Sequence, residues 1–159
     1  MEFLFRHLFV LMFAVCMLPV LSACGTKKPK PSPEAVIDFG SSSIYTEAER
    51  NNAVLLIKDK FASFTGDCEL HSIRYAGDEA NNEENLKWLN SLREARSDIP
   101  PEDVGKEYVQ VAEFLMDFHT PKDVGDTTLK ADSDYTDYQW WLARTADSGW
   151  EIVTFGYGY

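Results

Sequence analysis

Apolar side chains recur every three or four positions between residues 45 and 65, a spacing that predicts one buried face of a helix. The recurring positions are Val54, Ile57, Phe61 and Phe64. Thr46 and Glu49 have the spacing of a capping box, in which each side chain accepts a hydrogen bond from the other residue's backbone. Gly66 can adopt the left-handed conformation that ends many helices. We therefore predict a long amphipathic helix over this segment.

A second helix is predicted over residues 82–97 from the same kind of spacing. The apolar positions on one side are Leu86, Leu89 and Leu92. Charges that suit the helix dipole are Glu83 and Glu84 near the start and Arg93 and Arg96 near the end. Pro100-Pro101 ends the segment, because proline cannot continue a helix.

Two strands are predicted on either side of this second helix. In residues 68–75 the side chains of His71, Ile73 and Tyr75 share one face, as in a half-buried strand. Residues 107–119 carry β-branched and aromatic side chains on both faces, which is typical of a central strand. Their Ala-Glu-Phe-Leu-Met core would also suit a helix.

Two aromatic-rich segments at the end of the chain predict a hairpin. Residues 135–146 and 150–159 flank the turn Asp147-Ser148-Gly149. The resulting order is helix, strand, helix and three strands. This order predicts an α+β domain, in which a curved antiparallel sheet wraps around the N-terminal helices.

The first 23 residues have the pattern of a signal peptide. Arg6 and His7 precede an apolar run, residues 8–21, that is too short to span a membrane comfortably. The run ends in Leu21-Ser22-Ala23-Cys24, which resembles the lipobox of bacterial lipoproteins. The resemblance implies that Cys24 receives a diacylglyceryl group, becomes the mature N-terminus and holds the protein in the lipid bilayer. An ordinary secretory signal and an uncleaved anchor are the alternatives.

The segment after Cys24 has the composition of a tether. Residues 25–33 hold three lysines and three prolines and no apolar side chain to bury, which favours an extended chain. The predicted organisation is a signal peptide (residues 1–23), a lipidated cysteine with its tether (24–43) and one α+β domain (44–159). The predicted location is the extracytoplasmic face of the cell membrane.

The charge balance argues against nucleic acid as a partner. The 159 residues include 15 basic and 26 acidic side chains, for a formal net charge of −11. Residues 34–159 hold 11 of these basic and 25 of these acidic side chains, a net charge of −14. A protein that binds by neutralising phosphates requires the opposite sign.

The C-terminal sequence resembles a known fold family. The likeness lies in Trp140-Trp141-Leu142-Ala143-Arg144, Gly149-Trp150-Glu151-Ile152 and Gly156-Tyr157-Gly158. These stretches resemble the last two strands of nuclear-transport-factor-2-like domains, which have a cone-shaped, cystatin-like fold. Together with Phe118-His119-Thr120-Pro121 and Tyr135-Thr136-Asp137, they are similar to a family of uncharacterised lipoproteins from Gram-positive bacteria. The resemblance implies a pocket between sheet and first helix and homodimerisation through the sheet, but no particular activity.

Seven residues are candidates to face such a pocket. Asp117 and His119 are two positions apart in a predicted strand, so they share a face and would suit a general base with an orienting partner. Alternatively, His119 caps the turn before Pro121. The candidate ligand-binding residues are His71, Tyr75, Tyr108, Trp140 and Trp150.

No metal or cofactor is predicted. The histidines and cysteines lack zinc-ligand spacing, and the carboxylates of residues 132–137 lack the pattern of a helix-loop-helix calcium site. An irregular calcium site and a solvated acidic turn are the alternatives for that segment.

Trp140 and Trp141 are adjacent in a predicted strand and therefore point to opposite faces of the sheet. If one lies in the core, the other is either covered by the N-terminal segment or a sheet neighbour, or marks an interface. The sequence as a whole predicts a membrane-anchored module that binds a small ligand or a protein of the cell envelope. The alternatives are an enzyme with acid-base chemistry of the isomerase or dehydratase type and a purely structural homodimer.

Overall fold

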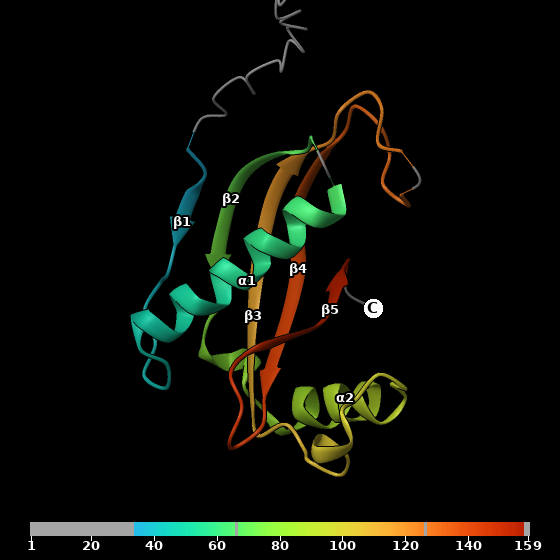
Figure 1. Ribbon diagram of the computed structural model, residues 1–159. Helices are drawn as coiled ribbons and strands as arrows, with labels where there is room; N and C mark the ends of the chain where they lie inside the picture. Colours follow the sequence, from blue (N-terminus) through green and yellow to red (C-terminus); the bar gives the residue numbers. More distant parts are fainter. Residues whose placement is uncertain (1–33, 66, 126, 158–159) are drawn as a thin grey trace, which may run out of the picture. The chain divides into compact units, whose positions relative to one another are not determined.

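The computed structural model describes residues 34–65, 67–125 and 127–157 (Figure 1). The predicted signal peptide, Cys24, Gly66 and most of the tether lie outside the described residues, as does the side chain of Phe64. Within the described part of the chain, no helix is both long and apolar enough to cross a membrane.

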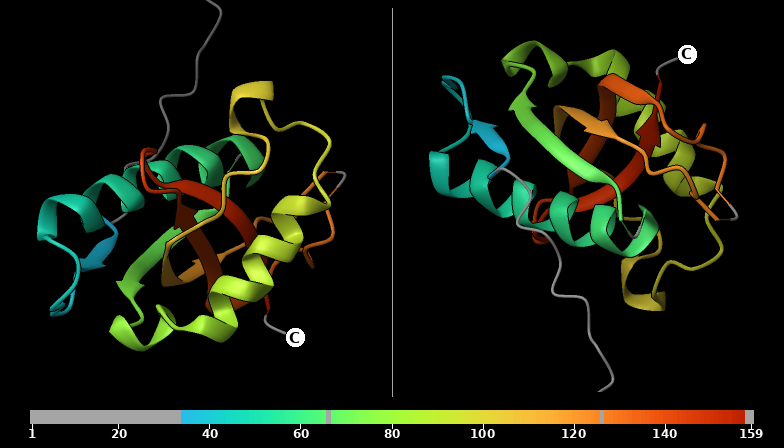
Figure 2. Two further views of the ribbon diagram at one scale, coloured as in Figure 1. Left: turned by 90° about the horizontal axis from the view of Figure 1, so that it is seen from below. Right: turned by 90° about the horizontal axis from the view of Figure 1, so that it is seen from above.

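The described residues form a five-stranded sheet with one long helix on each face (Figures 1 and 2). The helices are α1 (Glu47–Thr65) and α2 (Glu83–Glu94), with the short 3-10 helices η1 (Asp78–Ala80) and η2 (Pro101–Asp103). The strands are β1 (Val36–Asp38), β2 (Glu69–Tyr75), β3 (Gln110–His119), β4 (Asp134–Arg144) and β5 (Glu151–Gly156). The spatial order of the strands is their order in the chain. The predicted α+β class and the predicted sequence of helices and later strands are confirmed.

The sheet differs from the fully antiparallel prediction at one edge. Strands β2 to β5 pair antiparallel, but β1 pairs parallel with β2, with Ile37 opposite Ile73. The helix α1 provides the long crossover that a parallel pair requires. The sequence pattern missed β1 because three residues are too few to show a period.

Helix α1 begins with the predicted capping box. The Glu49 amide donates to Thr46 Oγ1 at 3.2 Å, and the Thr46 amide donates to Glu49 Oε2 at 2.8 Å. The predicted apolar residues Val54, Ile57 and Phe61 are at most 5% exposed. They pack in one core cluster with the inward face of the sheet, where the Phe61 and Phe118 rings lie 5.0 Å apart. Burial of this face fixes α1 across β2, β3 and β4 (Figure 1).

Helix α2 packs on the opposite face and covers one end of the sheet (Figure 2). Its N-cap residue Asn82 accepts a hydrogen bond from the Asn85 amide at 2.9 Å. Leu89 is fully buried, in a second core cluster with Tyr108, Val111 and Ala143. The predicted helix 82–97 is therefore confirmed, although it ends three residues earlier.

A bulge in β2 changes the predicted face of one candidate residue. The register of β2 against β3 shifts between Leu70 and Ser72. Ile73 and Tyr75 are buried as predicted, but His71 is exposed. The strict alternation that placed all three side chains on one face is wrong at His71, because an inserted bulge residue breaks the two-residue period.

Asp78 joins the segment before α1 to the end of β2. Its carboxylate accepts hydrogen bonds from the Ser42 hydroxyl at 2.5 Å, the Ser43 amide at 2.7 Å and the Tyr75 hydroxyl at 2.9 Å. These bonds, from Ser42 above all, hold the pKa of Asp78 well below its usual range. The network fixes the direction in which the chain enters α1.

Candidate ligand-binding pocket

A pocket of about 410 Å³ lies where the chain leaves α2 and returns to β3. Its lining residues are Asn90, Arg93, Glu94, Arg96, Ser97, Ile99, Val104, Gly105, Lys106 and Glu107. Gly105 has a φ of +83°, a conformation that suits glycine and turns the chain from η2 toward β3. A smaller pocket of about 140 Å³ adjoins it and shares Arg93, Arg96 and Ile99.

Arg93 forms the buried wall of both pockets. Its side chain is 7% exposed, and its guanidinium lies 4.8 Å from the centre of the Tyr108 ring. Nε donates to the Lys106 carbonyl at 2.9 Å, and a terminal nitrogen donates to Glu151 at 2.6 Å. These contacts leave Arg93 little capacity to bind a further anion.

The other two cations of the larger pocket are also paired. Arg96 bonds Asp98 at 2.9 Å and shares the Glu151 carboxylate with Arg93, at 3.2 Å. Lys106 bonds Asp103 at 2.9 Å and Asp147 at 3.0 Å, and these bonds raise the pKa of Lys106. The positive charge of the pocket is therefore balanced by carboxylates of the same chain.

Two carboxylates of the lining are outside this network. Among the contacts of the described residues, Glu94 and Glu107 have no hydrogen bond or ion pair from their side chains. Ile99 and Val104 add apolar surface, and Val104 is 69% exposed. An acidic rim beside apolar surface suits a ligand that carries a positive charge on a short apolar group.

Asn90 fixes the chain segment that forms the far wall. Its side-chain oxygen accepts from the Tyr108 amide at 2.7 Å, and its amide nitrogen donates to the Tyr108 carbonyl at 3.2 Å. This two-point bond ties α2 to the start of β3. The pocket is consequently bounded by two elements held at a fixed separation.

The structure places the predicted pair Asp117 and His119 in two separate networks. Asp117 accepts hydrogen bonds from the Ser72 hydroxyl at 2.8 Å and the Asp137 amide at 2.9 Å. His119 Nδ1 bonds Asp134 at 2.8 Å, and its Nε2 lies 3.5 Å from Asp132. The bond to Asp134 raises the pKa of His119. Their side chains share a face, but the partner that orients His119 is Asp134.

The predicted aromatic contacts lie mainly in the interior. Tyr75 and Tyr108 are 8% and 2% exposed, and Trp140 is fully buried. Trp150 is half-buried, between the Tyr45 ring and the Arg144 guanidinium. None of these residues, nor exposed His71, is among those that line the two pockets; Tyr108 supports them only through Arg93 and Asn90.

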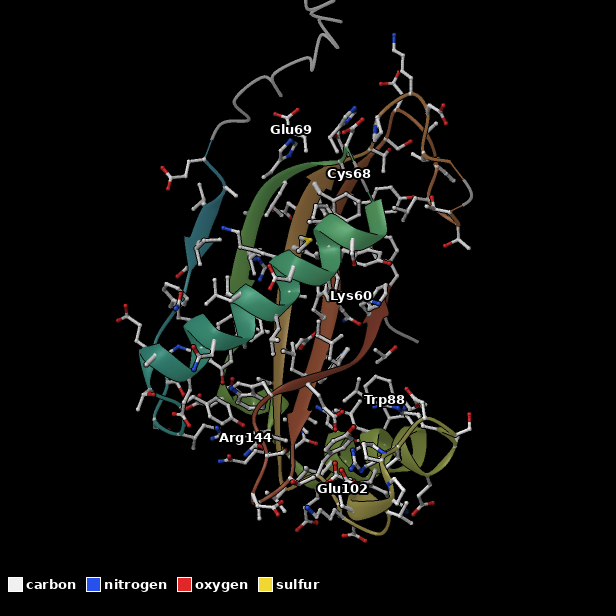
Figure 3. The ribbon with its side chains drawn as sticks, in the orientation of Figure 1. Lys60, Cys68, Glu69, Trp88, Glu102 and Arg144 are labelled. Carbon is white, nitrogen blue, oxygen red and sulfur yellow. The ribbon has the colours of Figure 1, made fainter. Side chains whose placement is uncertain are left out.

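The outer tryptophan is Trp141, and α2 covers it. Figure 3 labels Trp88 on α2. The Trp88 ring meets the Trp141 ring at 87°, with 5.2 Å between their centres. Trp140 points into the core on the opposite face. The covering element is thus neither the N-terminal segment nor a neighbouring strand.

Sequence reasoning did not identify Arg93, Glu94 or Glu107 as site residues. Arg93 was predicted as a cation at a helix end, which correctly gives its position but not its burial. Residues 96–107 have no periodicity, so their approach to α2 has no signal in the pattern. The one available sign was the Pro100-Pro101 pair, which forces the chain to turn at this place.

Comparisons with known proteins do not assign the chain. No family model matches it, and neither does a curated protein sequence or a solved structure. In the part of the chain that the structure describes, no group of three or more histidine, cysteine, aspartate and glutamate side chains could hold a metal ion.

Proposed function

We propose that the protein is a lipid-anchored extracytoplasmic module that binds a small cationic ligand in the pocket at the end of α2. The observation that carries this proposal is the composition of the lining. All three cations are paired within the chain, whereas Glu94 and Glu107 remain available. A ligand with an amino or guanidino group on a short apolar chain would bond the carboxylates and cover Ile99 and Val104.

The size of the pocket supports a small ligand. Binding sites for such molecules are commonly clefts of roughly 300 to 1,000 Å³, and this one is about 410 Å³. The net charge of −14 in residues 34–159 raises the local concentration of cations around the whole domain. Charge and pocket therefore favour the same class of ligand.

The proposal of a lipid anchor rests on the sequence from Leu21 to Cys24. A diacylglyceryl group on Cys24 would bury two acyl chains, which suffices for stable attachment because each buried methylene contributes roughly 0.8 kcal/mol. Residues 25–33 would then link the membrane to the domain. We also propose the cone-type subclass for this domain, supported by α1 lying across one face of an antiparallel β2–β5 meander.

Native mass spectrometry of the full chain, extracted from its membrane in a non-ionic detergent, tests the pocket. We expect a retained compound with a basic group. Ser97→Trp places a large side chain in the lining and should remove this extra mass. Ser63→Trp, an exposed change on α1 at a residue that lines neither pocket, should keep it. A chain without extra mass, or a compound still bound by Ser97→Trp, contradicts the pocket.

Metabolic labelling with an alkyne fatty acid tests the anchor. We expect the label on the wild-type chain and its loss from Cys24→Ser. Cys68→Ser is the matched control and should keep the label. A Cys24→Ser chain that keeps the label would reject lipidation at Cys24.

A further inference from the structure

The described residues cover the sheet face opposite α1 only in part. Helix α2 lies over one end of it, above Val111, Ala143 and Trp141 (Figure 2). Next to this covered end, Glu113 of β3 stands directly opposite Trp141 of β4 in the register. Side chains opposite each other in an antiparallel pair lie on the same face, with about 5 Å between their Cβ atoms. Glu113 therefore adjoins the Trp88–Trp141 pair.

Glu113 is a half-buried carboxylate that lacks a donor. Among the described residues, its side chain has no hydrogen bond and no ion pair. Burial raises the pKa of Glu113, and the positive charge of Arg74 offsets part of that effect. Arg74 pairs with Leu115 and so lies on the same face of the sheet as Glu113, but its guanidinium is bonded to Asp137. A partly desolvated carboxylate without a donor favours a ligand that brings an N–H group and a positive charge.

The two tryptophans supply the remaining sides of a cation site. Their ring planes meet at 87°, so they form two walls of a corner, and both side chains are half-buried. The face of an indole ring attracts cations more strongly than the faces of the other aromatic side chains. The rings also offer apolar surface to an alkyl chain that approaches along the sheet.

We propose that Glu113, Trp88 and Trp141 bind the ammonium group of a lysine side chain presented by a partner protein. The ammonium group donates to Glu113, while the methylene groups and part of the charge contact the indole rings. A primary ammonium fits better than a quaternary one, because only the primary ion has N–H groups for the unpartnered carboxylate. The acidic domain would attract a basic partner over a longer range. This site is distinct from the pocket of the proposed function and goes beyond it.

A titration followed at the indole N–H signals in ¹H–¹⁵N NMR spectra tests the site. The full chain in a non-ionic detergent is titrated with Nα-acetyl-lysine-N-methylamide. We expect the Trp88 and Trp141 signals, assigned from Trp88→Phe and Trp141→Phe, to shift to saturation. The norleucine counterpart, which lacks the charge, should not shift them. Glu113→Gln should raise Kd about tenfold, as expected when a charge-assisted hydrogen bond is lost.

Matched variants separate this site from the pocket and from general charge effects. Glu47→Gln removes the same charge from an exposed position on α1 and should leave Kd within about twofold. Glu107→Gln changes the pocket and should also leave these shifts intact. The proposal is overturned if Glu113→Gln binds like wild type, if norleucine binds as well as lysine, or if Glu107→Gln abolishes the shifts. Tighter binding of the trimethylated lysine probe would likewise overturn the role of Glu113 as acceptor.

Discussion

The two faces of the sheet are covered to different extents, although they alternate residue by residue along the same strands. On β3, Phe114, Met116 and Phe118 point toward α1 and are at most 1% exposed. Between them, Leu115 and Asp117 point to the other face and stay half-buried. One face is therefore a closed core, whereas the other is a surface that α2 covers only at one end.

This difference separates the side chains that stabilise the fold from those that are available to bind a ligand. Most of the aromatic side chains suggested by the sequence as ligand contacts, such as Tyr75 and Trp140, belong to the closed core. Several described carboxylates lack a partner, and three of them lie at the candidate sites: Glu113 on the open face, and Glu94 and Glu107 in the pocket at the end of α2. The aromatic residues of the sequence thus mark the core. The candidate sites are marked by carboxylates without partners beside a pocket or a partly exposed aromatic surface.

The largest expected effect compares adjacent residues of β3. Phe114→Ala should lower the free energy of unfolding by about 3 to 5 kcal/mol, because it leaves a cavity in the closed core. Leu115→Ala should cost about 1 kcal/mol or less, because its side chain keeps part of its contact with water. Urea unfolding followed by circular dichroism measures both. Equal losses would mean that the open face is buried in the protein in solution.

A second comparison concerns the two arginines that share Glu151. Arg93→Met should destabilise the fold by about 2 kcal/mol, since it removes the bonds to two elements and leaves Glu151 with Arg96 alone. Arg96→Met, at 32% side-chain exposure, should cost between about 0 and 1 kcal/mol. The same urea series gives both values. A larger loss for Arg96→Met would show that Arg93 is not the residue that holds this end together.

The sequence predicted the parts of the fold that depend on residues close together in the chain. The three-and-four spacing of α1, its Thr46–Glu49 capping box and the turn before β5 are local patterns, and each appears in the structure. Such patterns work because a helix face or a hairpin is determined by residues that are near in the chain.

The features that the sequence missed depend on distant residues or on broken periods. His71 is exposed because β2 has a bulge where it pairs with β3. Strand β1 pairs with β2 because α1, which lies between them in the sequence, returns the chain to the side of β1. The pairing of His119 with Asp134 crosses the irregular segment 121–133. The pocket likewise joins α2 to a segment without periodicity. The spacing of residues along the chain carries no information on any of these long-range contacts.

The α1 side of the molecule should respond to acid through Glu49. Hydrogen bonds from Thr46 and then from Arg144 lower the pKa of Glu49 to about 2, below its usual value of about 4.3. The stabilisation is therefore present above the usual pKa and is lost as the pH falls from about 4.5 toward 2. We expect about 1 kcal/mol at pH 6, because the side chain is 31% exposed.

The measurement for Glu49 is urea unfolding at pH 6 and at pH 3. Glu49→Gln should be less stable than wild type at pH 6, and the gap should narrow at pH 3. Glu47→Gln, an exposed change in the same first turn, should follow the wild-type profile. A Glu49→Gln gap that is the same at both pH values would assign its effect to packing rather than to charge.

On the face opposite α1, the smallest expected effect lies near neutral pH, at His119. The bond to Asp134 raises the pKa of His119, so its stabilisation is complete below the usual value of about 6.5 and is lost as the pH rises through the raised pKa. Protection of the Asp132 and Ser133 amides against hydrogen exchange, corrected for intrinsic rates, should therefore fall between pH 6 and pH 9. His119→Gln should flatten this decline.

The decline should be small, because Thr120 also holds the segment through its hydroxyl, which accepts from the Ser133 amide at 2.9 Å and does not titrate in this range. If wild type and His119→Gln lose protection equally, the histidine does not secure the segment, and its bonds to Thr120 and to the Pro121 carbonyl account for its order.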